Sequence, residues 1–243
     1  MNKKFSKIHE LFEFDKTNKK DSDYIIGTDE AGRGPGAGPV FAAAVCFVSD
    51  IDDEIFEKLS VLNDSKQLTE KKREELYEKI KELEKAGKCV CSVQEGSVSQ
   101  IDKMNILNTS LDCMKRSCES VAGKIDMQKA KVLVDGNKLI KNFSIPQITV
   151  VKGDSKSAAI AAASILAKVS RDRLMEKLSR EYPQYHWEKN KGYLSAEHIE
   201  AIKTYGATKF HRAKFLRNIL AATDPVSKNR KIPEQPESQL SLF

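Results

Sequence analysis

The sequence contains the stretch Gly27-Thr28-Asp29-Glu30-Ala31-Gly32-Arg33-Gly34-Pro35-Gly36-Ala37-Gly38-Pro39-Val40. It begins inside a short β-like run at residues 24–28 and leads into a second β-like run at residues 40–48. Because glycine and proline interrupt regular structure, the two runs are expected to be strands joined by a loop. We therefore predict a β-hairpin, with Asp29 and Glu30 at the end of its first strand.

The rest of the chain alternates between helix-like and strand-like segments. Helices are expected from apolar periodicity, alanine content and terminating glycines, and strands from short β-branched runs. The expected helices span residues 69–85, 105–121, 157–180, 195–205 and 213–222, and the expected strands span residues 89–93, 131–134 and 148–151. This order predicts an α/β fold, a mixed β-sheet flanked by helices, with a C-terminal helical extension.

The length of 243 residues suits one domain with extensions. Residues 1–22 are polar and rich in lysine, with a short apolar patch at Ile8, Leu11, Phe12 and Phe14, and we expect them to form an appended arm. Residues 23–222 form the predicted domain. Residues 223–243 are rich in Pro, Ser, Lys and Glu, which predicts a flexible tail.

The composition indicates a folded protein without a membrane span. Apolar residues make up 40% of the chain and charged residues 31%, which argues against global disorder. No run approaches the roughly eighteen uncharged apolar residues of a membrane helix, and the N-terminus lacks a signal-peptide pattern. We expect a soluble, cytoplasmic protein. No feature establishes its oligomeric state, and a monomer is the expectation.

Neither the cysteines nor the net charge of the chain indicates a particular function. The five cysteines are odd in number and lie in apolar or amphipathic stretches, so we expect reduced thiols in the core. They are Cys46, Cys89, Cys91, Cys113 and Cys118. The 41 Lys and Arg exceed the 35 Asp and Glu, for a net charge of +6. This balance permits a polyanionic partner without requiring one.

Four carboxylates lie where a predicted strand or its connection meets a loop or a helix start: Asp29, Glu30, Asp135 and Asp154. Carboxyl ends of strands collect ligands in α/β folds, so separate segments could bring these groups together. Clustered carboxylates repel one another unless a cation neutralises them, and oxygen ligands suit Mg²⁺ or Mn²⁺. Taken singly, each carboxylate is also explained as a turn residue or a helix cap.

The glycine-rich loop is open to several interpretations. Its glycines allow close approach of a ligand to the backbone, and Arg33 offers a fork for phosphate. The loop is not a P-loop, because no Gly-Lys-Ser/Thr follows. A dinucleotide site is disfavoured, because Pro39 and a β-like run replace the helix that such a site requires. A hairpin loop without any ligand remains a possible interpretation.

Taken together, the motifs resemble bacterial ribonuclease HII, the type 2 ribonuclease H family. The match begins with residues 27–40 and continues in family order to about residue 220. The other matching motifs are Asn-Asp-Ser-Lys-Gln-Leu at 63–68, Asn-Ile-Leu-Asn at 105–108, Val-Asp-Gly-Asn at 134–137, Lys-Gly-Asp-Ser-Lys at 152–156, Ala-Ala-Ala-Ser-Ile-Leu-Ala-Lys-Val at 161–169 and Lys-Gly-Tyr at 191–193. The resemblance implies a ribonuclease H-like fold.

The resemblance also implies an activity. The family hydrolyses the RNA strand of RNA/DNA hybrids and nicks duplex DNA 5′ of an embedded ribonucleotide, leaving 3′-hydroxyl and 5′-phosphate ends with Mn²⁺ or Mg²⁺ as cofactor. By this resemblance Asp29, Glu30, Asp135 and Asp154 would be the catalytic metal ligands of a two-metal site. Such an enzyme would serve ribonucleotide removal in DNA repair and replication.

The same resemblance assigns nucleic-acid contacts. Gly32, Arg33 and Gly34 would contact the ribonucleotide 2′-hydroxyl and its phosphate, and Tyr193 would pack on the neighbouring deoxyribose. A 2′-hydroxyl is the group that distinguishes RNA from DNA at a given site. The basic residues that become candidates for phosphate contact are Lys152, Lys156, Lys168, Arg171 and Arg173. On their own, such basic clusters are more often solvated surface.

Three alternatives remain beside this interpretation. Ribonuclease HIII has a similar core but usually carries a large extra N-terminal domain, for which 22 residues are too few. A catalytically silent nucleic-acid-binding module is disfavoured by the intact carboxylates. A dinucleotide-dependent oxidoreductase is disfavoured by the missing helix after the glycine loop.

The C-terminus ends in Gln239-Leu240-Ser241-Leu242-Phe243. This resembles the peptide by which bacterial repair and replication proteins bind the β sliding clamp, with Gln239, Leu240, Leu242 and Phe243 as the binding residues. An apolar cluster at the end of a polar tail suits a partner groove. A chance apolar terminus, or one folded onto its own domain, is the alternative.

Overall fold

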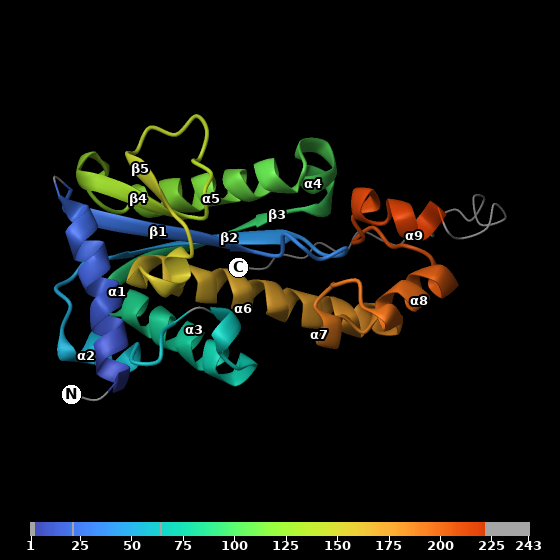
Figure 1. The fold of residues 1–243 in the computed structure, drawn as a ribbon, viewed down its shortest axis with the longest axis horizontal. Helices are drawn as coiled ribbons and strands as arrows, with labels where there is room; N and C mark the ends of the chain where they lie inside the picture. Colours follow the sequence, from blue (N-terminus) through green and yellow to red (C-terminus); the bar gives the residue numbers. More distant parts are fainter. Residues whose placement is uncertain (1–2, 21, 64, 222–243) are drawn as a thin grey trace.

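The computed structural model describes residues 3–20, 22–63 and 65–221 and contains a five-stranded sheet at its centre (Figure 1). The strands are β1 (Tyr24–Ala31), β2 (Val40–Phe47), β3 (Cys89–Gly96), β4 (Ala130–Asp135) and β5 (Gln147–Val150). Their order is β3-β2-β1-β4-β5. β1, β2 and β3 pair antiparallel, whereas β1, β4 and β5 pair in parallel. The predicted hairpin and the predicted mixed sheet are therefore confirmed.

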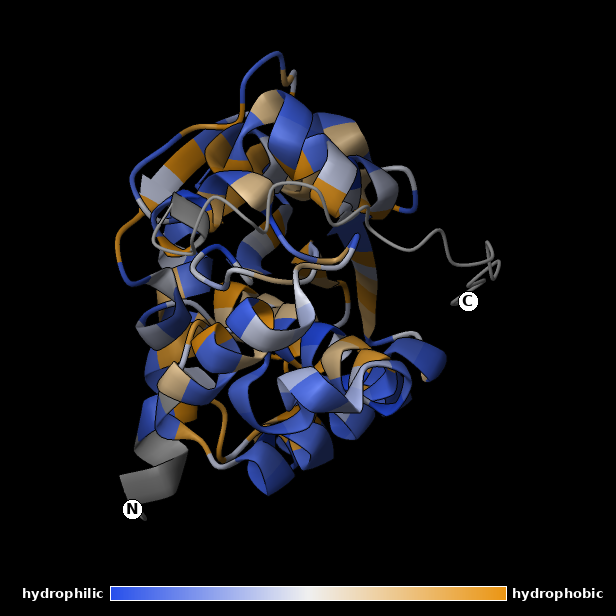
Figure 2. Ribbon diagram, turned by 90° about the vertical axis from the view of Figure 1, so that its right-hand side faces the viewer, coloured by the Kyte–Doolittle hydropathy of each residue, from blue (hydrophilic) through white to orange (hydrophobic). Residues whose placement is uncertain are grey.

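Helices cover both faces of the sheet. α5 (Ile106–Ala122) lies on one face, and α6 (Ala158–Glu181) and α3 (Glu70–Lys85) lie on the other (Figure 1). β2 is buried along its whole length, which explains its continuous apolar sequence. Its alternate side chains enter the two cores on either side of the sheet. Hydrophobic segments accordingly concentrate between the layers (Figure 2).

α6 approaches the sheet closely at Gly27. A Cβ atom at Gly27 would lie 2.2 Å from the backbone nitrogen of Ile160. Only glycine fits there, because the neighbouring atoms belong to the backbone and cannot move aside. This contact places the start of α6 over the middle of β1.

The long helices begin at the positions that their capping residues indicate. The side chains of Thr69, Asn105 and Ser157 accept hydrogen bonds from the first turns of α3, α5 and α6. The sequence did not predict the short helices α2 (Asp53–Lys58), α4 (Val98–Met104) and α7 (Trp187–Asn190). They contain only four to seven residues, too few to show a helical period.

The helical extension lies at one end of the molecule (Figure 1). It includes α7, α8 (Ala196–Tyr205) and α9 (Arg217–Ala221). The helix expected over residues 213–222 is divided into a 3₁₀ turn (Ala213–Phe215) and α9. Trp187 is fully buried at the centre of the extension, in contact with Tyr182, Tyr185, His198, Phe210 and His211.

The N-terminal segment differs from the expected appended arm. It forms α1 (Lys3–Lys19), in which Ile8 and Leu11 are fully buried and Phe12 is nearly so. These residues lie at i, i+3 and i+4, so they form one apolar stripe, which packs into the same core as α6. The sequence shows this apolar patch, but its shortness among many Lys and Glu residues favoured a segment outside the domain. α1 is instead part of the domain.

Other expectations concern the cysteines, the membrane and the tail. All five cysteines are free and buried, as predicted. Among the described residues, no helix combines the length and the apolar character needed to cross a bilayer. The predicted tail at residues 223–243, with Gln239, Leu240, Leu242 and Phe243, lies outside the described residues.

Candidate active site

A pocket of about 260 Å³ lies at the carboxyl end of β1. It combines residues that are far apart in the sequence and that the family resemblance assigns to metal binding, to the glycine loop and to phosphate contact. The lining residues are Asp29, Glu30, Ala31, Gly32, Arg33, Gly34, Ser65, Arg73, Asp135, Ser164, Lys168, Arg171 and Tyr193. Three of the four predicted carboxylates therefore face one pocket.

The parallel pairing of β1 with β4 brings the carboxylates together. Thr28 pairs with Val134, so Asp29 and Asp135 follow at the same edge of the sheet. Asp29 is buried and accepts a hydrogen bond from the Glu30 amide at 2.7 Å. Glu30 lies 3.3 Å from the Arg33 guanidinium. The carboxylates are thus held by backbone geometry that the strands impose.

Asp154 reaches the same region from another element. It is buried in the 3₁₀ turn Gly153–Ser155, which directly precedes α6. The amide of Gly153 donates to Asp135 Oδ1 at 2.7 Å, which ties this turn to the end of β4. Asp154 does not line the pocket itself. The structure therefore places it beside the other three rather than among them.

The electrostatics of the pocket suit a cation. Burial, and then the charges of Glu30 and Asp135, raise the pKa of Asp29 well above its ordinary range. A hydrogen bond from Ser164 opposes this rise. The donor atoms are carboxylate oxygens, the ligands that Mg²⁺ and Mn²⁺ prefer. Within residues 3–20, 22–63 and 65–221, however, no three His, Cys, Asp or Glu side chains converge closely enough to enclose an ion by themselves.

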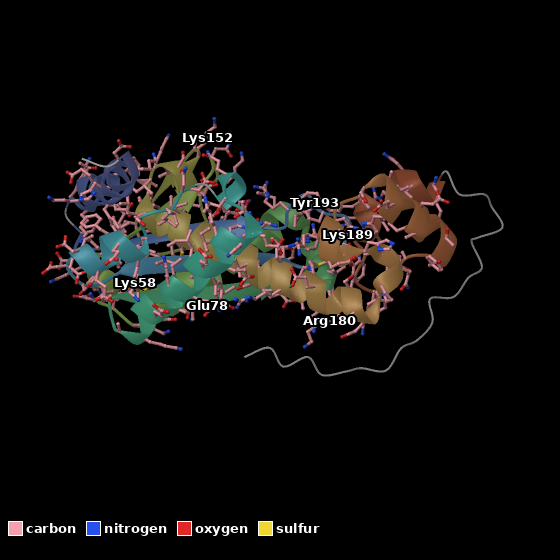
Figure 3. All side chains as sticks on the ribbon, turned by 90° about the horizontal axis from the view of Figure 1, so that it is seen from below. Lys58, Glu78, Lys152, Arg180, Lys189 and Tyr193 are labelled. Atoms are coloured by element: carbon pink, nitrogen blue, oxygen red, sulfur yellow. The ribbon has the colours of Figure 1, made fainter. Side chains whose placement is uncertain are left out.

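The glycine loop and Tyr193 form the other wall of the pocket. Gly192 O accepts hydrogen bonds from the amides of Gly36 and Ala37, at 2.9 and 3.2 Å. A Cβ atom at Gly34 would lie 3.3 Å from the Tyr193 ring, so the ring sits directly against this glycine. Tyr193 is 54% exposed, and it lies beside the C-terminal helices (Figure 3). An exposed aromatic ring on a glycine wall can stack on a nucleotide.

Comparisons with known proteins agree with this geometry. The family model for ribonuclease HII matches residues 26–218. The chain is 49% identical over 205 residues to the ribonuclease HII of Fusobacterium nucleatum, covering 84% of this chain and 91% of that protein. The chain belongs to the ribonuclease HII family.

Solved structures of the family have the same architecture. The ribonuclease H2 of Pyrococcus horikoshii has a TM-score of 0.60 and 28% identity, covering 81% of this chain and 96% of that one. The ribonuclease HII of Archaeoglobus fulgidus, solved in complex with PCNA, has a TM-score of 0.59 and 26% identity, covering 77% and 93%. This ribonuclease HII family member is a hydrolytic nuclease of the ribonuclease H type, and the family depends on divalent metal ions.

The basic residues predicted from the ribonuclease HII resemblance lie in different surroundings. Lys152 and Lys156 are exposed on either side of Asp154, and Lys152 lies toward α1, away from Tyr193 (Figure 3). Lys168 lines the pocket and donates to Asp172 at 2.6 Å. Burial lowers the pKa of Lys168. These three positions are compatible with phosphate contact, which stays a prediction.

Two arginines differ from that prediction. Arg171 is 1% exposed, and its guanidinium donates to the carbonyls of Ala37, Pro39 and Lys191. Arg173 points elsewhere and pairs with Glu74 and Glu78. The structure therefore explains both arginines by contacts within the protein. Arg171 and Arg173 have different surroundings because side chains two positions apart on a helix point in different directions.

Sequence reasoning missed several residues of this ribonuclease HII site. Ser65 and Ser164 are hydrogen-bonded at 3.0 Å behind Asp29, and Arg73 lines the pocket. Both serines lie inside motifs quoted for the resemblance, which was the available signal. Arg212 is fully buried under the glycine loop and had no such signal.

A buried histidine pair holds Tyr193. The Thr208 amide donates to His211 Nδ1 at 2.9 Å, so the neutral ring carries its proton on Nε2, which faces His198 Nε2 at 3.1 Å. Trp187 also donates to His198 Nε2, at 3.0 Å. The His198 proton is therefore on Nδ1, which donates to the Tyr193 carbonyl at 2.9 Å. Burial, and then His198, lower the pKa of His211 to about 3.

Proposed function

We propose that this protein cleaves the RNA strand of RNA/DNA hybrids and nicks duplex DNA on the 5′ side of embedded ribonucleotides. The observation that carries the proposal is the single pocket in which the carboxylates of β1 and β4 meet the glycine loop and Tyr193. The carboxylates supply a hydrolytic centre, and the loop and ring supply a means of reading the sugar. Ribonucleotide removal during DNA repair and replication would follow from this activity.

The pocket residues take distinct roles. Asp29, Glu30 and Asp135 would hold divalent cations, with Asp154 beside them and with water and substrate oxygens completing the shell. A divalent ion there would act as a Lewis acid on the phosphodiester and favour ionisation of an attacking water, in a two-metal arrangement when two ions bind. The carboxylates orient that centre against the scissile phosphate, and the cut leaves a 5′-phosphate and a 3′-hydroxyl.

Recognition would use the opposite wall. The amides of the glycine loop can contact a 2′-hydroxyl and the adjacent phosphate without depending on the base. The exposed Tyr193 ring would pack on the neighbouring deoxyribose, and Lys168 would contribute charge to the phosphate backbone. Lys152 and Lys156 would extend this basic surface past Asp154.

Cleavage of an end-labelled DNA duplex that contains one ribonucleotide tests the proposal. The protein is assayed with Mg²⁺, with Mn²⁺ and with chelator, beside an all-DNA duplex and a long RNA/DNA hybrid. We expect a metal-dependent nick immediately 5′ of the ribonucleotide and none in the all-DNA duplex. Cleavage of the hybrid alone would remove Tyr193 from its junction-reading role, and cleavage in chelator would refute the metal mechanism.

We also propose that the C-terminal residues Gln239, Leu240, Leu242 and Phe243 bind the β sliding clamp. Support comes from the sequence resemblance and from the archaeal relative that was solved in complex with PCNA. Deletion of residues 239–243 is expected to abolish binding to purified clamp while leaving ribonucleotide cleavage unchanged. Unchanged clamp binding would contradict the proposal.

A further inference from the structure

Two fully buried arginines lie beneath the glycine loop. Arg171 comes from α6 and is 1% exposed, and Arg212 comes from the segment before α9 and is 0% exposed. The β1–β2 loop and the segment that carries Arg212 meet at the same end of the molecule (Figure 1). Neither arginine forms an ion pair with a carboxylate of the described residues. Two buried cations that are not directly paired with a carboxylate are costly, so their retention calls for a function.

Both guanidinium groups donate to backbone carbonyls of the loop. Arg212 donates to Gly32 O at 2.6 Å, Arg33 O at 3.2 Å, Pro35 O at 2.8 Å and Gly38 O at 2.8 Å. Arg171 donates to Ala37 O and Pro39 O, both at 3.1 Å, and to Lys191 O at 2.9 Å. The Arg212 amide adds a bond to Gly36 O at 2.8 Å. These bonds hold almost every carbonyl of residues 32–39 toward the protein interior.

The inward carbonyls determine what the loop presents to the pocket. Among the described residues, no backbone carbonyl accepts a hydrogen bond from the amide of Arg33 or Gly34. Gly32 adopts φ +100°, and a Cβ atom there would lie 2.2 Å from Arg171 Nε, so glycine is required for this packing. The pocket side of the loop is therefore a set of N–H donors above two buried positive charges, which is an anion-binding arrangement.

The two arginines are expected to remain charged at neutral pH. Burial, and then the neighbouring Arg171, lower the pKa of Arg212 to about 9. Burial lowers the pKa of Arg171 to about 10. Both values stay well above 7, so both groups keep donating to the carbonyls.

We propose that Arg171 and Arg212 are positioning residues for ribonucleotide recognition, which hold the loop carbonyls inward so that its amides and the buried charge face the phosphate and sugar beside the cut. The inference rests on the proposed function, because it assumes that this loop reads the ribonucleotide. Lysine cannot replace either arginine, since an ammonium group lacks the planar fork that reaches several carbonyls at once.

Kinetics of Arg212→Lys test the inference. On the single-ribonucleotide duplex we expect kcat/KM to fall about 10- to 100-fold, because several charge-assisted hydrogen bonds are lost. The inhibition constant of an all-DNA duplex, measured in the same assay, should change less than about threefold. Loss of folded protein would lower only the apparent kcat/KM, so kcat/KM is expressed per folded molecule, with the folded fraction taken from urea unfolding. A general distortion of the binding surface would instead raise the inhibition constant of the all-DNA duplex as well. The matched control is Arg217→Lys, at an exposed arginine five residues along the chain.

The outcomes separate this inference from the proposed function. If the wild-type protein does not cut at the ribonucleotide, the proposed function fails. If it cuts and Arg212→Lys folds with unchanged kcat/KM, the inference is overturned. Arg171→Lys is the second variant, with the same expectation. Should neither variant fold, amide hydrogen exchange of the free wild-type protein decides: the amides of Arg33 and Gly34 must exchange fast, because the inward carbonyls leave them facing the pocket. Strong protection of both amides in the free protein overturns the inference.

Discussion

Replacing His211 with asparagine should remove a specific part of the acid sensitivity of this protein. His211 is 4% exposed, and the Thr208 amide, the Trp187 indole and the His198 ring surround the pair to which it belongs. The Thr208 amide already donates to Nδ1, so a second proton on that nitrogen would displace this bond and place a positive charge in a buried site beside His198. Asparagine keeps an oxygen that can accept from Thr208 but cannot take up a proton near pH 6.

The magnitude follows from the two pKa values of His211. The ordinary value is 6.5 and the folded value is about 3, so the unfolded chain binds the proton first as the pH falls. The stabilising contribution is complete above pH 6.5 and is lost progressively between pH 6.5 and 3. At pH 4 the loss is roughly 2.5 pH units at about 1.36 kcal/mol per unit, a little over 3 kcal/mol.

Urea unfolding at pH 7 and pH 4 measures this difference. Trp187 is the single tryptophan of the chain and lies in the same cluster, so its fluorescence reports on this region. Between the two pH values the wild-type free energy of unfolding should fall about 3 kcal/mol more than that of His211→Asn. The control is His186→Asn, whose side chain is 47% exposed and which should behave as wild type. If the free energy of unfolding falls equally between pH 7 and pH 4 in wild type and in His211→Asn, the reasoning is refuted.

Three further predictions concern α1 and the carboxylates. Leu11→Ala should lower the free energy of unfolding by about 2–5 kcal/mol, because Leu11 is fully buried, and urea unfolding measures this. Lys16→Ala, at a side chain that is 77% exposed, is the control; a change as small as the control's would show that α1 is not integral to the domain. Asp135→Asn should reduce turnover to less than a few per cent of wild type while duplex affinity and folding are kept, and appreciable residual nicking would remove Asp135 from the catalytic set. Adding Mn²⁺ to chelator-treated protein should raise its Tm, since the ion neutralises the repulsion around Asp29, and Asp29→Asn should show a smaller rise in thermal unfolding. An equal rise in both proteins would contradict a metal role for Asp29.

The sequence by itself was sufficient for the hairpin and the long helices, and it singled out the three carboxylates that the structure places in one pocket. Those features depend on local information: the apolar period of α3 and α5, the caps Thr69 and Asn105, and the glycines that bound the loop. The resemblance added roles for Gly32, Arg33, Gly34 and Tyr193, because its motifs are short and contiguous. The short helices escaped detection, since fewer than two turns leave no period to recognise.

Only the tertiary structure decided which distant residues share a site. Arg212 lies 180 residues from Gly32, and its buried contacts with the loop carbonyls have no counterpart in local sequence. The stripe of α1 became part of the core only because the sheet and α6 offer it a complementary surface. Arg171 and Arg173 differ by two positions, yet one is buried beneath the loop and the other pairs with Glu74. Burial and hydrogen bonding depend on how separate elements pack against one another. Local sequence patterns do not show this tertiary packing.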